Sequence, residues 1–81
     1  MRVRIKLFAQ LRDAAGAGDL TCDVTEASTA DDVWLTLVEE RPALAPYGSS
    51  VSCAVNAEYA KRHTRVKADD EVAFLPPVSG G

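Results

Sequence analysis

Long hydrophobic runs are absent from this sequence of 81 residues. No apolar stretch approaches the roughly 18 residues that cross a bilayer, and residues 1–6 alternate charged with hydrophobic side chains, which is not typical of a signal peptide. Cysteine is scarce, and Cys22 and Cys53 lie too far apart in the chain to suggest a zinc site. We therefore expect a soluble, cytoplasmic protein that holds no metal.

Net charge is also small, and its value of −3 argues against a general nucleic-acid binder. The charge is unevenly distributed, because residues 1–12 carry four bases and no acid, whereas residues 13–40 carry eight acids and no base. Two interpretations are open: the blocks form neighbouring solvated faces that attract each other, or the basic block steers an acidic partner. A chain of this length forms one small domain, whose marginal stability favours a stabilising partner.

Both cysteines fit strand positions. Each alternates with hydrophobic residues two positions before and two positions after it, so Cys22 and Cys53 are predicted to be small core residues. The sequence does not exclude a single disulfide between Cys22 and Cys53, although a cytoplasmic protein normally keeps its thiols reduced.

Hydrophobic periodicity predicts five strands and one main helix. Alternation of hydrophobic and polar side chains is typical of a strand, and spacings of three and four residues are typical of a helix. The predicted segments are a short helical turn over 9–15, a main helix over 30–40, strands over 2–8, 20–24, 51–55, 59–61 and 71–75, and loops over 43–50 and 62–70.

The main helix begins with two overlapping capping patterns, Ser28 with Asp31 and Thr29 with Asp32. A single long helix covers one face of one sheet. The order of elements therefore predicts an α+β fold of the β-grasp (ubiquitin-like) type, in which a mixed sheet wraps around the main helix. The last strand is expected to lie beside the first, in the middle of the sheet.

Three large hydrophobic side chains are predicted on the sheet face that points away from the helix. If the alternating hydrophobic residues of the first and last strands face the helix, then Phe8 and Leu75 face away, and Tyr59 on a short neighbouring strand joins them. Scattered exposed hydrophobic residues are common, but three of them near one edge fit an interface core better. We predict that Phe8, Tyr59 and Leu75 anchor a partner subunit.

The predicted domain spans residues 1–75, and residues 76–81 form an extended tail that ends in Gly-Gly. Pro76 and Pro77 stop strand pairing and stiffen the chain, and six extended residues reach about 20 Å. Because glycine has no Cβ atom, the last two residues fit a narrow channel and leave the carboxylate open to attack. The tail is predicted to carry this carboxylate into the active site of another protein.

No catalytic set accompanies the tail in the sequence. His63, the single histidine, lies among bases in a predicted loop, without an evident pairing of carboxylate and nucleophile. Ser49 and Ser50 lack a nucleophile-elbow motif, and residues 16–18 lack the pattern of a phosphate-binding loop. This combination favours a carrier over a self-sufficient enzyme.

Three segments carry a resemblance to a known family: residues 8–12 (FAQLR), 54–56 (AVN) and 70–81 (DEVAFLPPVSGG). The first two are weak motifs, whereas the last is specific. Over essentially its whole length the chain resembles the small subunits of molybdopterin synthase (MoaD), a ubiquitin-like sulfur-carrier family. One departure is Asp69, where the family usually has glycine. Asp tolerates the left-handed conformation better than most residues, so the turn is expected to survive.

The resemblance implies a function for the tail. In that family a ubiquitin-activating-type enzyme uses ATP to adenylate the terminal glycine, here Gly81, and a sulfur donor converts it to a thiocarboxylate. The tail enters the large catalytic subunit, with Gly80 beside Gly81, and the sulfur passes to cyclic pyranopterin monophosphate in molybdopterin (molybdenum cofactor) biosynthesis. The assembly is a heterotetramer, and no cofactor bound to the small subunit is implied. The implied partner contacts include the three outward hydrophobic residues and Pro76, Pro77, Val78 and Ser79.

Other functions share a Gly-Gly end. The alternatives are a sulfur carrier for thiazole, tRNA thiolation or cysteine synthesis, and a ubiquitin-like modifier that is joined through Gly81 to lysines of target proteins. A purely structural interaction domain with an unmodified tail is a third alternative. The sequence alone leaves this choice open.

Overall fold

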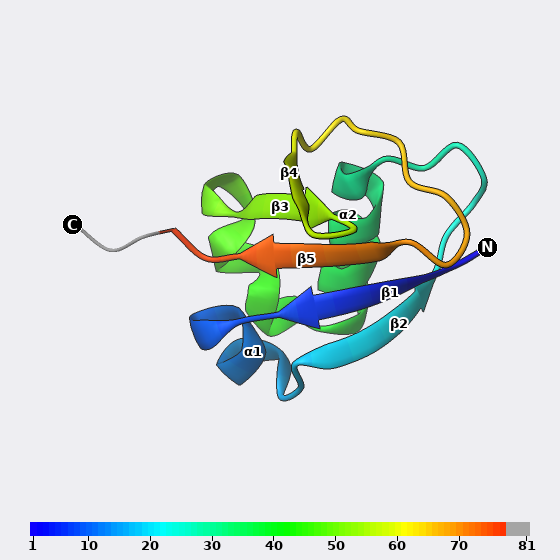
Figure 1. Ribbon diagram of the computed structural model, residues 1–81. Helices are drawn as coiled ribbons and strands as arrows, with labels where there is room; N and C mark the ends of the chain where they lie inside the picture. Colours follow the sequence, from blue (N-terminus) through cyan, green and yellow to red (C-terminus); the bar gives the residue numbers. More distant parts are fainter. Residues whose placement is uncertain (78–81) are drawn as a thin grey trace.

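Five strands form one mixed sheet in the computed structural model, which describes residues 1–77 (Figure 1). The order across the sheet is β2-β1-β5-β3-β4, with β1 and β5 parallel and the other neighbouring pairs antiparallel. The central position of β5 beside β1 confirms the predicted β-grasp architecture. The strands are β1 (Arg2–Leu7), β2 (Asp19–Asp23), β3 (Ser52–Val55), β4 (Glu58–Ala60) and β5 (Glu71–Leu75).

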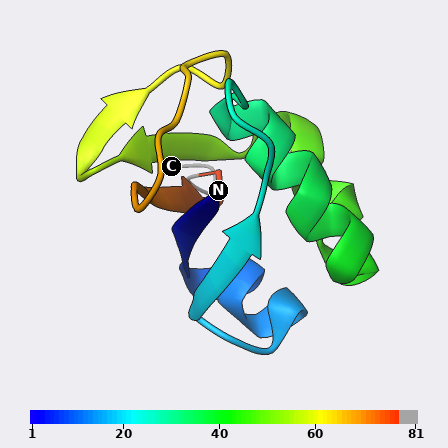
Figure 2. The same ribbon diagram turned by 90° about the vertical axis from the view of Figure 1, so that its right-hand side faces the viewer.

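One long helix, α2 (Ala30–Glu40), covers a single face of the sheet (Figure 2). It buries Val33, Trp34 and Leu37, and the alternating hydrophobic residues of β1 and β5 are buried as well. The Trp34 ring meets the ring of Phe74 edge-on, with 5.1 Å between the ring centroids. The core therefore lies between α2 and one face of the sheet, as the alternation predicts.

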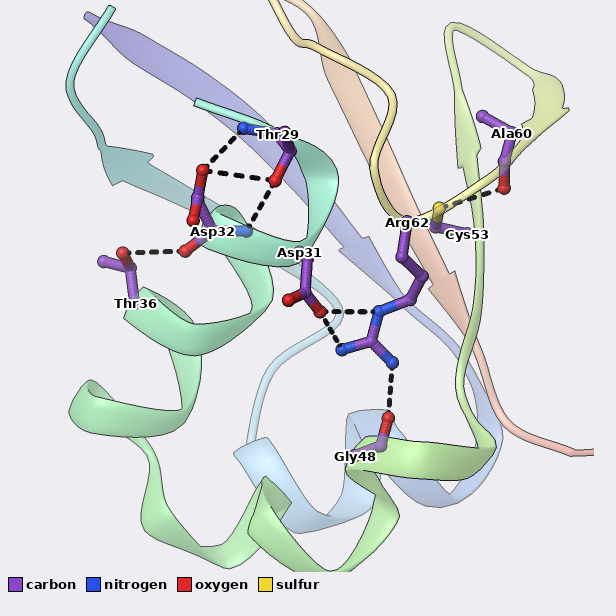
Figure 3. A network of polar contacts seen from close by, with 8 residues as sticks. All are labelled: Thr29, Asp31, Asp32, Thr36, Gly48, Cys53, Ala60 and Arg62. Carbon is purple, nitrogen blue, oxygen red and sulfur yellow. Dashed lines mark hydrogen bonds and ion pairs between the residues drawn. The ribbon is translucent and has the colours of Figure 1, made fainter. Parts of the chain in front are cut away.

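The first turn of α2 is held by Thr29. Its hydroxyl accepts a hydrogen bond from the Asp32 amide (3.2 Å), and Asp32 Oδ2 accepts one from the Thr29 amide (2.9 Å; Figure 3). Ser28, the other candidate cap, is buried, and its hydroxyl donates to the Thr25 carbonyl (2.7 Å). Of the two predicted patterns, Thr29 with Asp32 therefore forms the capping box.

One of the two segments predicted as loops forms a helix instead. Residues 43–50 belong to a 3-10 helix, η1 (Pro42–Ser50), because Pro42 suits a first helical turn and Leu44 is fully buried. The segment 62–70 is irregular, as predicted, and it buries Val66 in the core. Proline, glycine and serine occur in loops and in short 3-10 helices alike, so composition does not separate the two.

The short helix α1 (Ala9–Ala15) connects β1 to β2 and ends at Gly16, whose φ of 80° is left-handed. β1 ends at Leu7, so Phe8, predicted as the last residue of this strand, precedes α1 instead. The other strand ends lie within one residue of the predicted positions. In the described part of the chain, no helix is long and apolar enough to cross a membrane.

Candidate functional site

The sheet face opposite α2, here called the outer face, presents a row of four side chains. The register pairs Lys6 with Ala73, Ala73 with Ala54, and Ala54 with Tyr59. Because the residues before and after Ala73 are fully buried in the core, this row points away from α2. Tyr59 stands at one end with 83% of its surface exposed, beside a low floor formed by the two alanines.

Phe8 and Leu75 lie together where the central strands end. Leu7 pairs with Phe74 in the parallel ladder, which places Phe8 one step further along, beside Leu75. Phe8 is 45% exposed and Leu75 is half-buried. Tyr59 lies on β4, two strands away from β5, or about 10 Å across the sheet. The three residues therefore do not gather near one edge of the sheet. Tyr59 lies on the same face as Phe8 and Leu75 but is not adjacent to them.

The exposure of Phe8 depends on a sharp change in backbone direction. Phe8 itself is extended (φ −129°, ψ 155°), and the next residue, Ala9, has a left-handed φ of 49°, which is uncommon for alanine. The Phe8 carbonyl accepts hydrogen bonds from the amides of Leu11 (3.1 Å) and Arg12 (3.4 Å). The chain thus turns into α1 immediately after Phe8 and leaves its side chain exposed.

Two of the three bases of β1, Arg2 and Lys6, are paired with acids of neighbouring strands, whereas Arg4 Nη2 donates to the Asp69 carbonyl (3.3 Å). Arg2 Nε lies 3.2 Å from Asp23 Oδ1, and Lys6 Nζ lies 3.0 Å from Asp19 Oδ1. Lys6 Nζ is also 4.0 Å from Glu71 Oε1. The hydrogen bond that Lys6 donates to Asp19, together with the negative charge of Asp19, raises the pKa of Lys6. The ion pairs across β1 and β2 support the first interpretation of the charge blocks for Asp19 and Asp23, and the steering of an acidic partner stays a prediction.

β5 leads the chain from the centre of the sheet directly into the tail segment. Leu75 ends the strand, and Pro76 is half-buried whereas Pro77 is exposed. Figure 1 shows that β5 ends at the same end of the molecule as α1. The other predicted tail residues lie outside the described residues; they are Val78, Ser79, Gly80 and Gly81.

The remaining candidates do not form a reactive group. Cys22 and Cys53 are free and buried, so the disulfide that the sequence left open is not formed. Burial raises the pKa of Cys22 to about 11 and also raises the pKa of Cys53, so neither becomes a reactive thiolate readily. His63, Ser49 and Ser50 are exposed. Within residues 1–77, no three metal-ligating side chains come together.

Two residues that the sequence pattern does not single out are prominent in the structure. Arg62, in the predicted polar loop, bonds to the Asp31 carboxylate and the Gly48 carbonyl (Figure 3). Leu35 on α2 is 55% exposed. Helical periodicity could have identified Leu35, because it lies one position outside the apolar stripe. The pairing of Arg62 with Asp31 joins residues 31 positions apart, and no local pattern indicates it.

Comparison with known proteins gives matches over nearly the whole chain. The ThiS family model matches residues 5–81. The molybdopterin synthase sulfur carrier subunit of Arabidopsis thaliana is 36% identical over 81 residues, which cover 100% of this chain and 84% of that protein. Small archaeal modifier protein 1 of Haloferax volcanii is 36% identical over 84 residues, with 94% of this chain and 97% of that protein covered. The crystal structure of that modifier superposes with a TM-score of 0.88 at 34% identity and covers 100% of both chains.

Proposed function

The chain belongs to the ThiS family, and we propose that it is the sulfur carrier subunit of molybdopterin synthase. The observation that carries this proposal is the full-length similarity to the Arabidopsis sulfur carrier subunit. It is supported by a central strand that leads through Pro76 and Pro77 toward Gly80 and Gly81, a segment included in the family match. The tail carries the sulfur, and the folded sheet holds the tail against its partners.

The chemistry takes place at the carboxylate of Gly81. A ubiquitin-activating-type enzyme uses ATP to convert this carboxylate, a poor electrophile, into an acyl-adenylate and releases pyrophosphate. Sulfide attacks the acyl carbon and displaces AMP, which leaves a thiocarboxylate, a soft nucleophile at neutral pH. Two such sulfur atoms, delivered one after the other to cyclic pyranopterin monophosphate, form the dithiolene of molybdopterin.

The outer face is the docking surface for the large catalytic subunit. Tyr59 is the strongest anchor because it is the most exposed large side chain of the outer face and stands beside the small residues Ala54 and Ala73. Phe8 and Leu75 lie at the start of the tail, so contacts to them orient the tail as it enters the partner. The residues that follow Pro77 then carry Gly81 to the active site, in an assembly of two large and two small subunits.

The described residues contribute binding rather than proton transfer or nucleophilic attack. Both thiols are buried and have raised pKa values, so the transferred sulfur travels on the tail rather than on a cysteine. The groups that bind ATP, pterin and sulfur donor belong to the partner enzymes. A protein that supplies the tail and the binding surface, but no catalytic groups, matches a carrier that is inactive on its own.

A protein modifier is the second candidate, favoured by the similarity to small archaeal modifier protein 1. In that function the same Gly81 carboxylate forms an isopeptide bond with a lysine of a target protein. Sulfur carriers for thiazole, tRNA thiolation or cysteine synthesis use the same activated tail and differ in the acceptor of the sulfur. The identity of the acceptor therefore separates all of these functions.

Reconstitution with purified components tests the proposal. The full-length chain, the activating enzyme, ATP, sulfide and the large subunit are expected to convert cyclic pyranopterin monophosphate to molybdopterin. Deletion of Gly81 should abolish the conversion and leave thermal unfolding unchanged, because the buried core of the described chain ends at Phe74. Sulfur transfer to a different acceptor alone, or lysine adducts without molybdopterin, would contradict the proposal.

A further inference from the structure

A groove beside α2 has no part in the function proposed above. It lies between the solvent-facing side of α2 and the segment that leads from β2 to α2, and its volume is about 390 Å³. The residues that matter for its chemistry are Val24 and Leu35 on its apolar part and Asp23, Asp32 and Glu39 on its rim. Figure 2 shows α2 in the layer opposite the sheet, so this groove and the outer face lie on different sides of the molecule.

The apolar part of the groove is centred on Leu35. Its side chain is 55% exposed although the neighbouring Val33 and Trp34 are fully buried, because it points away from the core stripe of α2. Asp32 and Glu39 lie three positions before and four positions after Leu35, so all three occupy one helix surface. Val24 is half-buried and forms the opposite wall. The exposed Leu35 side chain is thus flanked by the carboxylates of Asp32 and Glu39 on the same surface of α2.

The groove is negatively charged and contains no base. Among the described residues, Asp23 pairs with Arg2, whereas no Lys, Arg or His lies within ion-pair distance of Asp32 or Glu39. Asp32 uses Oδ2 in the capping box with Thr29, so the groups that remain available on the rim are Asp32 Oδ1 and the Glu39 carboxylate.

We propose that this groove binds a basic, extended segment of a partner protein. An apolar side chain of that segment packs on Leu35 and Val24, while Lys or Arg residues on either side of it face Asp32 and Glu39. A second copy of this chain is disfavoured as the occupant, because each copy carries a net charge of −3 and like charges oppose self-association.

The position of the groove has a consequence for assembly. A partner on the outer face and a basic partner in the groove contact opposite layers of the molecule, so both can bind at the same time. Binding of the basic partner does not depend on the chemistry of the tail, so the groove can be occupied whether the tail carries sulfur or modifies proteins.

A nuclear magnetic resonance titration of the full-length, isotopically labelled chain tests the groove. The probe is the peptide acetyl-Lys-Leu-Arg-Val-Lys-amide, and two matched peptides replace either its bases with glutamate or its apolar residues with serine. We expect shifts of amide signals that concentrate in residues 23–39 with the first peptide, and much weaker binding of both matched peptides.

Variants locate the binding site. Leu35→Asn and Glu39→Lys should each weaken peptide binding by about tenfold or more, as expected for an anchor and its charged rim. Asp13→Lys, which makes the same charge change at an exposed position on α1, should alter binding less than about twofold at physiological salt. The proposal is wrong if the peptide causes no shifts in the groove, if Leu35→Asn binds as well as the parent chain, or if Asp13→Lys and Glu39→Lys weaken binding equally.

Discussion

The Arg62 guanidinium lies against the Asp31 carboxylate, with Nη2 2.6 Å and Nε 3.0 Å from the same oxygen, Oδ1. The guanidinium also donates to the Gly48 carbonyl and lies 5.7 Å from the centre of the Trp34 ring. The backbones meet at the same place, because the Asp31 amide donates to the Arg62 carbonyl (2.8 Å). One side chain thus connects the segment after β4 with the first turn of α2 and with η1.

Replacing Arg62 should destabilise the fold. We expect Arg62→Met to lower the free energy of unfolding by about 1–2 kcal/mol, because a half-buried carboxylate and a carbonyl lose their donors. Urea unfolding measures this change, and the exposed Arg65→Met serves as a control that should stay within about 0.5 kcal/mol of the parent chain. If Arg62→Met and Asp31→Asn prove additive in the double variant, the two side chains are not coupled and this prediction fails.

The turn between β3 and β4 offers a stabilising substitution. Its two central residues both have positive φ, 51° at Asn56 and 70° at Ala57, as a type I′ turn requires. Asparagine tolerates this conformation better than alanine, so Ala57→Gly should raise the free energy of unfolding by about 0.5–1 kcal/mol in chemical denaturation.

The reverse substitution at another turn is the matched control. Gly16 has a φ of 80°, and a Cβ atom added there would meet no other atom within 4 Å. Gly16→Ala should therefore lower the free energy of unfolding by about 1 kcal/mol through backbone conformation alone. A loss of stability in Ala57→Gly would show that the turn is not strained.

Stability should depend on the ionisation of Asp70. Its Oδ1 accepts a hydrogen bond from Asn56 Nδ2 (3.0 Å) and its Oδ2 from the Lys67 amide (2.7 Å), and these bonds lower the pKa of Asp70. Because the folded chain has the lower pKa, this stabilisation is complete above the ordinary value of 3.8 and disappears as the pH falls through the lowered value. The stability difference between the parent chain and Asp70→Asn should therefore shrink in urea unfolding as the pH falls from about 7 to about 2. A difference that is constant over this range would contradict the assignment.

Binding of the large subunit should depend on Tyr59. Tyr59→Ser is expected to weaken the complex by about tenfold to a hundredfold, as for an interface anchor, and to leave thermal unfolding unchanged because the side chain is 83% exposed. Isothermal titration calorimetry measures the affinity, and Leu35→Asn on the opposite side of the molecule is the control. Equal losses of affinity in the two variants would exclude the outer face as the docking surface.

Local signals made the bounds of α2 and β5 predictable. The stripe of apolar residues and the Thr29 cap determine where the helix lies and begins, and the alternation before Pro76 determines where β5 ends. The outward orientation of Tyr59 also follows from alternation alone. These features depend on residues that are close together in the sequence.

Features that depend on distant partners were not predictable in the same way. In the sequence, Arg62 is one of several bases in a polar segment, and only the fold shows that it pairs with Asp31. Val66 is an isolated hydrophobic residue in the sequence, and only the fold shows that it is buried. The separation of Tyr59 from Phe8 follows from the order of strands across the sheet. The sequence predicted that β5 lies beside β1, but it did not predict that β4 lies two strands away from β5.

The mass of the C-terminal peptide, from chain purified out of the cells that make it, tests the sulfur-carrier function most directly. The account predicts a fraction in which one oxygen of the Gly81 carboxylate is replaced by sulfur, and this fraction should vanish in cells that lack the activating enzyme. A peptide found only unmodified, or only joined to lysine, in cells that actively make molybdopterin would contradict the account.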